Sequence, residues 1–343
     1  MPEVRRKTKS AHHGGLSALL NDELLLMFAD MAALRTLSRR CATVLDRRAC
    51  TATPRPSHLE QTAHEPRVGT KAWATISRLT QLSPSTTELQ LHVDASDAPD
   101  FAFSPGQWVD FYIPAIDKVG GYSITSLPSE LPQLDLAVKA SAHPPADWCT
   151  SRAKVGDRVG VRVGGTFVLR EAQSQLFVAG GVGINPLYSM LQALCMEPIG
   201  RSAPKAALLY TAQTSEELLF ASELEDLARR MPERTRFWLR ATREPLAAVT
   251  AAPGVCGFGS GRVGEAELEE ALRWLGCEPS VVREGRGVPW RAESRAREPG
   301  TAGSGCAAGL MRAYVCGPPR MTDEMVAALR RMGVADVHHE KWW

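Results

Sequence analysis

The sequence predicts two folded domains in series: an all-β domain over residues 70–170, then a doubly wound α/β domain with a parallel sheet over residues 171–343. Two patterns carry this prediction. Short runs that alternate apolar and polar residues fill the first region, and strands alternate with helices throughout the second. The length of 343 residues accommodates two domains of ordinary size.

The overall composition is that of a soluble globular protein, with 44% apolar and 23% charged residues. A net charge of +2 gives no reason to expect a nucleic-acid partner. No run approaches the ~20 uncharged apolar residues that a membrane-spanning helix requires. The eight cysteines lie far apart and lack zinc or iron–sulfur spacing, so we expect structural thiols and no metal site.

Residues 1–69 are predicted to be a disordered N-terminal region. Within it, MAALRTLSRRCATVLDRRACTATPRPSH is rich in arginine and has only Asp46 as an acid, which is the composition of a mitochondrial presequence over about residues 31–60. A plain disordered tail explains the composition equally well. The presequence interpretation predicts a mitochondrial protein, of the matrix, with Met31 as the working start.

The all-β domain is predicted from five short alternating runs: AWATISRL, TELQLHV, QWVDFYI, LDLAVKA and DRVGVRV. In QLDLAVK, the side chains of Leu134, Leu136 and Val138 should face one way, and those of Asp135 and Lys139 the other. Proline, glycine and serine turns separate the runs. Several short strands at this spacing indicate a sandwich or a small barrel.

The α/β domain is predicted from strands in QLFVAGG, ALLYTA, RFWLRAT and AYVC. We expect helices with Pro186 in the first turn, one opened by Ser215, one in EAELEEALRWL, and one capped by Thr322. Residues 283–309 contain five arginines and six glycines without an apolar period, which predicts a disordered insertion.

Two strand ends carry candidate binding residues. In AGGVGINPLYSML, the glycines Gly180, Gly181 and Gly183 let the backbone approach a ligand, and the next helix directs its free N–H groups at that ligand. An ordinary strand-to-helix turn has the same composition. In YVCGPPRM, Cys316 ends a strand at the rim where ligands bind, although a buried structural thiol fits as well.

The C-terminus HHEKWW ends in two tryptophans, which either cover a flat ligand or pack on the sheet edge. Neither His12–His13 nor His338–His339 has a ligand set nearby apart from Glu340, so a metal site is not expected.

The order of these motifs resembles the ferredoxin–NADP reductase superfamily. The run comprises SPGQWVDFYIP, GGYSITS, LAVK, VGDRVGVRVGGTF, AGGVGINP, YVCGPPRM and a C-terminal aromatic residue, and it covers about Thr70 to Trp343 apart from Arg283–Gly309. The resemblance implies a six-stranded antiparallel flavin barrel followed by a nicotinamide-binding α/β domain.

The resemblance also implies roles for individual residues. Tyr122 would stack on the isoalloxazine, Ser123 would bond near flavin N5, and Cys316 would lie beside nicotinamide C4. The HPPADWCT turn would offer N–H groups to the flavin pyrophosphate, and Gly180 to Pro186 would hold the dinucleotide. The catalytic candidates are Ser123 and Cys316, and the cofactor-binding candidates are Tyr122, Ser123, Val138, Lys139, Ala146, Trp148, Gly180, Gly181, Val182, Gly183, Ile184, Asn185, Pro186, Thr211, Cys316, Gly317, Pro318, Met321 and Trp343.

The implied chemistry is hydride transfer from NADH to FAD N5 and onward to a separate acceptor, because the chain has no iron–sulfur pattern of its own. NAD(H) is favoured over NADP because Glu216 and Glu217 stand where a 2′-phosphate would need a cation.

The sequence departs from the family at the flavin phosphates. Gly120 stands where the family has an arginine, and Pro144 and Pro145 lack N–H groups in the phosphate turn. Whether the protein binds FAD therefore depends on whether the flavin phosphates can be held without the arginine that Gly120 replaces. The alternatives are a flavin-free NAD-binding protein and a pseudo-enzyme that serves as an interaction or sensor protein on the same scaffold.

Overall fold

The computed structural model describes residues 56–342, apart from residues 95, 97, 197–203, 245–254 and 278–310. The chain divides into two compact units, Met1–Pro56 and Ser57–Trp343, and both sheets belong to the second unit. Of the presequence predicted over residues 31–60, residues 31–55 lie outside the described residues. The insertion predicted at 283–309 and the candidate residue Trp343 lie outside them entirely.

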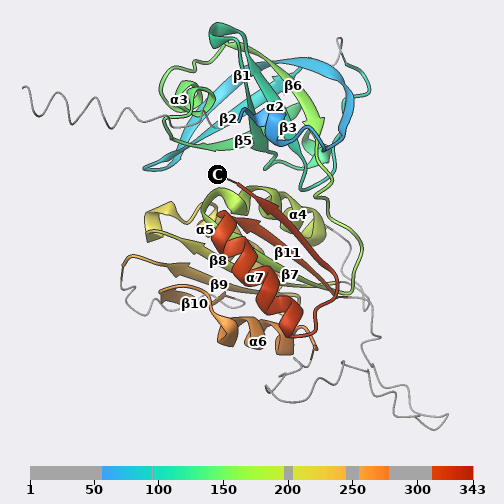
Figure 1. Ribbon diagram of the computed structural model, residues 1–343, viewed down its shortest axis with the longest axis vertical. Helices are drawn as coiled ribbons and strands as arrows, with labels where there is room; N and C mark the ends of the chain where they lie inside the picture. The colour runs from blue at the N-terminus through green and yellow to red at the C-terminus, as the bar shows by residue number, and fades with distance from the viewer. Residues whose placement is uncertain are drawn as a thin grey trace, which may run out of the picture. The chain divides into compact units, whose positions relative to one another are not determined.

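Six antiparallel strands form the first sheet, in the order β4-β3-β6-β1-β2-β5 (Figure 1). An antiparallel bridge between Ile124 and Leu136 joins the end of β4 to β5 and so links the two edge strands. The six-stranded antiparallel sheet of the flavin type is confirmed. The strands are β1 (Arg67–Ser83), β2 (Thr86–Val93), β3 (Trp108–Ile113), β4 (Lys118–Ser123), β5 (Gln133–Lys139) and β6 (Arg158–Gly164).

Side-chain alternation along β5 follows the sequence pattern. Leu134, Leu136 and Val138 are fully buried in the barrel core, as the period of two predicts. Ala137, on the opposite face, is nevertheless only 3% exposed because it packs in the core of the α/β domain. This strand is therefore covered on both faces.

A second sheet of six strands, in the order β10-β9-β8-β7-β11-β12, is parallel throughout. Its strands are β7 (Ser174–Gly180), β8 (Lys205–Ala212), β9 (Thr235–Ala241), β10 (Val255–Ser260), β11 (Met311–Gly317) and β12 (Val337–Lys341). Its helices are α4 (Ile184–Met196), α5 (Ala221–Arg230), α6 (Glu265–Trp274) and α7 (Pro319–Arg331).

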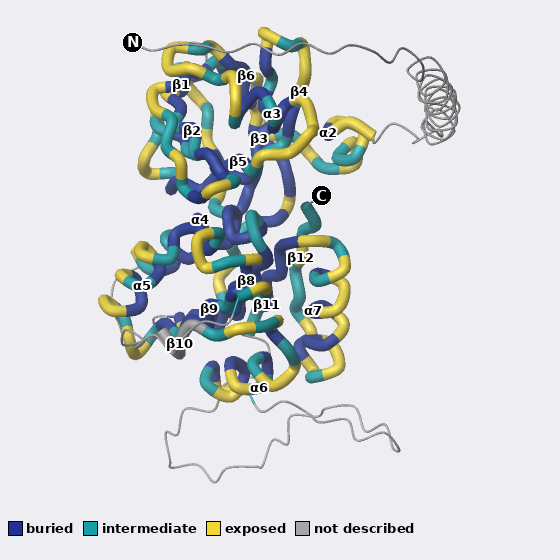
Figure 2. Tube along the Cα trace, turned by 90° about the vertical axis from the view of Figure 1, so that its left-hand side faces the viewer, coloured by how far each residue is buried: buried dark blue, intermediate teal, exposed yellow. Residues whose placement is uncertain are grey.

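The helices cover both faces of this sheet, which confirms the doubly wound prediction. Along β7, Phe177 packs in the core formed with α4 and α5, whereas Leu176 and Val178 pack in the core formed with α6 and α7. Figure 2 shows β8 and β9 largely buried, β12 intermediate, and the outward side of α7 exposed. Residues 278–310 leave after α6 and return at β11, and the flanking Cys277 Sγ and Met311 Sδ lie 3.0 Å apart.

The structure corrects two helix starts. The helix expected from Ser215 is a short 3-10 turn (Ser215–Glu217) followed by α5, with Phe220 between them at a φ of 59°. Three consecutive apolar residues there, Leu218–Phe220, are all buried, which a single helix face cannot achieve. Thr322 does not cap α7, because α7 begins at Pro319 and the buried Thr322 hydroxyl donates to the Gly317 carbonyl at 3.2 Å.

The prediction of disorder through residue 69 is wrong from Ser57 onward. Helix α2 (His58–Gln61) starts with a capping box between Ser57 and Glu60. The buried His58 ring approaches Asp110 Oδ1 with Nε2 at 2.9 Å, and Arg67 Nε donates to Asp110 Oδ2 at 3.0 Å. Two long-range contacts to one carboxylate therefore hold this segment on the barrel, and neither is visible in the local sequence.

The His58 ring occupies the side-chain space of Gly121 in β4. A Cβ on Gly121 would lie 2.0 Å from the ring carbon Cε1, so Gly121→Ala should destabilise the fold by about 1–3 kcal/mol. Urea unfolding measures this change. Gly264→Ala is the control, because its Cβ meets nothing nearer than 3.4 Å. The cost should shrink in a His58→Ala background, and an undiminished cost would contradict the contact.

Candidate functional site

Two neighbouring strands, β7 and β11, end at the same edge of the parallel sheet and form the centre of the site. Cys316 on β11 is paired with Ala179 on β7. A 3-10 turn (Gly181–Gly183) follows β7 and leads directly into α4. The connection from β7 leads to β8 on one side, while β11 lies on the other, so this is the crevice where doubly wound sheets bind ligands.

The glycines of this turn allow two backbones to touch. A Cβ on Gly183 would lie 2.2 Å from the Cys316 carbonyl oxygen, and one on Gly180 would lie 2.5 Å from Met321 Sδ. Gly181 differs, because its Cβ position faces open space and its φ is 55°. The turn is therefore packed against β11 on one side and open on the other.

Most of the candidate dinucleotide residues are brought together here. Gly317, Pro318 and Met321 meet the glycine turn, since Pro318 Cδ is 3.0 Å and Met321 Sδ 2.5 Å from the Cβ position of Gly180. Ile184 and Pro186 are buried, so only their backbone can face a ligand, and Pro186 has no N–H. The Thr211 hydroxyl donates to the Ala179 carbonyl at 3.4 Å, at the end of the neighbouring strand β8.

Helix α4 binds the barrel through three side chains at helical spacing. Asn185 Nδ2 donates to the Ala137 carbonyl at 2.8 Å, Ser189 Oγ to the Ser126 carbonyl at 2.8 Å, and Gln192 Nε2 to the Thr125 carbonyl at 2.9 Å. These positions lie on one helix face. The turn that starts α4 is thus connected directly to β5, the strand that the resemblance assigns to the flavin.

The thiol of Cys316 is fully buried, and burial raises its pKa well above the ordinary value, with a further contribution from Glu340. It is therefore a neutral thiol and not a nucleophile. Glu340 on β12 stands opposite Cys316 in the strand pairing. Its Oε2 and the Nε1 of Trp342 are both buried and make no hydrogen bond of regular geometry. The Trp342 side chain is nevertheless close enough to both groups to oppose the rise in the pKa of Cys316 and of Glu340, so these three side chains interact with one another.

Sequence reasoning missed Glu340 and assigned the aromatic role to Trp343. Among the described residues, the aromatic residue at the site is Trp342, whose backbone N–H donates to the Gly317 carbonyl at 3.2 Å. The available signal was the alternation of His338, Glu340 and Trp342, which places all three on one face of a strand.

On the barrel side, Tyr122 and Ser123 end β4. The Tyr122 ring lies edge-on to Phe111 at 5.6 Å, and Cys149 Sγ donates to its hydroxyl at 3.9 Å. Burial raises the pKa of Tyr122 well above its ordinary value, and Cys149 adds to this shift. Ser123 is 5% exposed and paired with Trp108 on β3. Tyr122 packs against the barrel core and is half-buried, and the Ser123 side chain is buried, so only the exposed part of the Tyr122 ring can meet a ligand.

Three other barrel candidates are placed away from a ligand-facing position. Val138, Ala146 and Trp148 belong to the barrel core, so their side chains pack inside the domain. Only their backbone groups can serve a cofactor.

Lys139 and Glu217 form a contact that changes an earlier interpretation. Lys139 Nζ donates to Glu217 Oε2 at 3.4 Å, and Ser85 Oγ donates to the same oxygen at 2.7 Å. Burial disfavours the Glu217 carboxylate, but these hydrogen bonds outweigh burial and leave its pKa below the ordinary value. Glu217 therefore faces the barrel and does not select NAD over NADP, which leaves the exposed Glu216.

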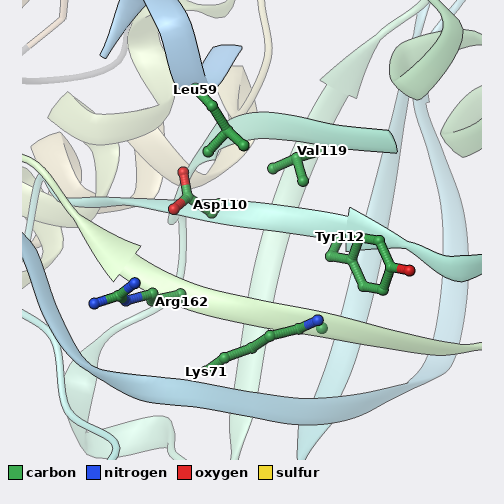
Figure 3. A pocket seen from close by; sticks show the side chains of 7 residues that line it. Leu59, Lys71, Asp110, Tyr112, Val119 and Arg162 are labelled. Atoms are coloured by element: carbon green, nitrogen blue, oxygen red, sulfur yellow. The ribbon is translucent and has the colours of Figure 1, made fainter. Parts of the chain in front are cut away.

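A hollow of about 210 Å³ lies elsewhere, on the outer face of the barrel (Figure 3). Lys71 Nζ lies 3.8 Å from the centre of the Tyr112 ring in this hollow. No candidate site residue lines it, so it is separate from the strand-end site. Its lining residues are Leu59, Lys71, Asp110, Tyr112, Val119, Gly160 and Arg162.

Among the described residues, no group of three or more His, Cys, Asp or Glu side chains could hold a metal ion. Within the same part of the chain, every helix is too short or too polar to span a membrane.

Comparisons with known proteins agree with this geometry. The family model of the oxidoreductase NAD-binding domain matches residues 177–273. Oxidoreductase NAD-binding domain-containing protein 1 of Bos taurus is 31% identical over 96% of this chain and 97% of its own. The electron transfer component of toluate 1,2-dioxygenase from Pseudomonas putida is 34% identical over 46% of each chain.

Among solved structures, a ferredoxin–NADP⁺ reductase from Neisseria gonorrhoeae with bound FAD and NADP superimposes with a TM-score of 0.57 and 17% identity. The match covers 80% of this chain and 100% of that one. The near-full-length relatives agree with the fold and the strand-end glycine turn, and the chain belongs to the oxidoreductase NAD-binding domain-containing protein 1 family, with the fold of a ferredoxin–NADP⁺ reductase.

Proposed function

We propose that the protein is an NAD(H)-dependent flavin oxidoreductase that passes electrons to a separate acceptor. The observation that carries this proposal is the hydrogen bond from Asn185, in the first turn of α4, to Ala137 of β5. It joins the turn that would hold a nicotinamide dinucleotide to the strand that would line a flavin.

The residues fit a dinucleotide at the glycine turn. The Cβ position of Gly181 faces open space, the N-terminus of α4 follows the turn directly, and the buried Asn185 Oδ1 has no hydrogen-bond partner. Cys316, Glu340 and Trp342 would enclose the nicotinamide end. A flavin held against Tyr122 and Ser123 would supply the two-electron chemistry. The protein's part is to align the two rings and to exclude water.

Glu340 gives this site a carboxyl group that keeps its proton at neutral pH. Burial raises its pKa to about 8; Trp342 and Trp108 oppose the shift, and Glu65 adds to it. A neutral carboxyl beside Cys316 adds no negative charge near the transferring hydride, and it can hold or deliver a proton at Oε2.

NADH is proposed as the donor because the exposed Glu216 follows β8. Arg243 is exposed at the end of the neighbouring strand, and its N–H donates to the Gln213 carbonyl at 2.9 Å. Comparison of kcat/KM for NADH and NADPH measures the preference.

Electron delivery to a redox protein is also a proposal. The toluate dioxygenase component named above is an electron transfer component, which supports a separate acceptor here.

A mitochondrial location is proposed from the composition of residues 31–60. Because Ser57 and His58 belong to the folded unit, a cleaved leader would have to end before Ser57. N-terminal sequencing of the mature protein tests this, and a mature chain that retains residues 31–50 would contradict it.

The competing function is an NAD-binding pseudo-enzyme or sensor, which Gly120 favours because it removes the family's phosphate-binding arginine. Absorbance of the purified protein with added flavin, followed on addition of NADH, separates the two. Bleaching of the flavin bands supports the reductase. Bound NADH without any flavin reduction supports the sensor.

Substitution of Cys316 should separate catalysis from binding. Cys316→Ala should slow flavin reduction about tenfold or more while the Kd for NADH changes less than about threefold, since the thiol would contact the ring only during transfer. Stopped-flow absorbance measures both. Cys195→Ala removes a partly buried thiol near the other end of α4 and should have no effect. Equal rates for Cys316→Ala and wild type would assign Cys316 a structural role.

Glu340 should make stability depend on pH. Its folded pKa of about 8 lies above the ordinary value of 4.5, so the folded state binds the extra proton between these values. Stability should therefore fall as pH rises from about 5 to 8, and this part of the fall should vanish in Glu340→Gln.

Urea midpoints from pH 4.5 to 8.5 measure the difference between Glu340→Gln and wild type. Glu324→Gln, an exposed α7 carboxylate paired with Arg320, is the control. Parallel curves for wild type and Glu340→Gln would show that Glu340 ionises normally.

A further inference from the structure

The barrel lacks the groups that would hold a flavin diphosphate beside Tyr122. A diphosphate carries negative charge at neutral pH, and proteins hold it with cations and with free N–H groups at a helix N-terminus. The two places where this barrel could offer such groups are position 120 of β4 and the start of α3 (Pro144–Ser151).

Position 120 has no space for a cation. A Cβ on Gly120 would lie 2.9 Å from both Cε2 and the hydroxyl of Tyr122, and 3.0 Å from Pro145 Cβ. The Tyr122 ring and Pro145 thus fill the side-chain space that an arginine would need. The arginine that would bind the phosphates is therefore absent, and the Tyr122 ring and Pro145 occupy the space where its side chain would begin.

The N-terminus of α3 has lost nearly all its donors. Helices normally leave their first amides free, but Pro144 and Pro145 have none. The Asp147 N–H is already bonded to the His143 carbonyl at 2.9 Å, which leaves Ala146, a buried residue. The Asp147 carboxylate also lies in the first turn, where it repels an anion, although Arg152 pairs with it at 2.8 Å.

Lys118 is a cation on β4 itself. It lies two and four residues before Gly120 and Tyr122, so the three share one face of the strand. Lys118 is exposed, and a single lysine on a flexible stem is a point charge rather than a two-pronged clamp. We expect it to contribute little.

Two features that could meet the flavin ring are, in contrast, present: the half-buried Tyr122 ring at the end of β4, and strand β5 fixed by Asn185. On the basis of the proposed function, we infer that the flavin is an exchangeable second substrate, bound by its ring and released after reduction. The C4–H bond of NADH breaks, its hydride forms the N5–H bond of the flavin, and a proton from water completes the reduction. The products are NAD⁺ and a free reduced flavin that carries both electrons to the acceptor.

The test compares riboflavin, FMN and FAD, which share the ring and differ in phosphates. Quenching of flavin fluorescence by the full-length protein gives the three Kd values. We expect them to agree within about threefold, whereas one charge-assisted hydrogen bond to phosphate strengthens binding about tenfold. FAD that binds about thirtyfold tighter than riboflavin, or that stays bound in stoichiometric amount through gel filtration, overturns the inference.

Steady-state NADH oxidation then separates the exchange of free flavin from the proposed oxidoreductase function. Saturation with free riboflavin, with release of reduced flavin, supports both. Turnover only from tightly bound FAD overturns the inference and leaves the oxidoreductase standing. NADH binding without reduction of any of the three flavins overturns both.

A matched pair of lysine variants tests the cation on β4. Lys118→Ala should weaken FAD and riboflavin binding by the same factor, less than about twofold, because an exposed charge is screened by solvent. Lys154→Ala, an exposed lysine in the turn before β6, is the control. A loss of FAD binding in Lys118→Ala alone, with riboflavin unchanged, would show that Lys118 holds the phosphates.

Discussion

The three hydrogen bonds from α4 to barrel carbonyls constrain the rest of the structure. Asn185, Ser189 and Gln192 donate to backbone atoms, whose positions are set by the sheet and not by flexible side chains. The same helix begins at the glycine turn, so its position fixes where that turn lies relative to β5. Under the proposed function, hydride transfer between two rings requires contact distance, so the contact between α4 and the barrel would decide whether the rings can meet. Glu217 reinforces it from the next strand connection through Ser85 and Lys139.

The two glycines of β4, Gly120 and Gly121, leave side-chain space that other residues fill. Tyr122 folds over Gly120, and the His58 ring covers Gly121, so each glycine admits a side chain from elsewhere. These contacts favour a rigid, well-packed strand end, and they remove the space in which a charged side chain could reach a phosphate. Under the proposed function, this packing would leave an aromatic ring to be recognised and would remove the contacts to its charged tail.

Much of the fold could be predicted from the sequence. Apolar and polar residues alternate along the strands of the barrel, and strands alternate with helices in the second domain, and both patterns reflect local geometry. The buried face of β5 and nine of the twelve strands followed from these patterns, whereas β4, β10 and β12 did not. The errors arose where distant contacts decide. His58 is ordered by Asp110, 52 residues away, and Glu217 turns toward Ser85. Glu340 acquires its raised pKa from burial, which HHEKWW alone does not reveal.

The contact between Cys277 and Met311 has a consequence for how this chain can vary. Cys277 and Met311, which flank the 33 residues of 278–310, lie close together at the amino end of β11, opposite the edge that holds the glycine turn. A loop whose ends already meet costs only slightly more entropy as it lengthens. The sheet therefore places almost no limit on what is inserted there, and a whole additional module could be carried at this edge without changing the distance between β7 and β11.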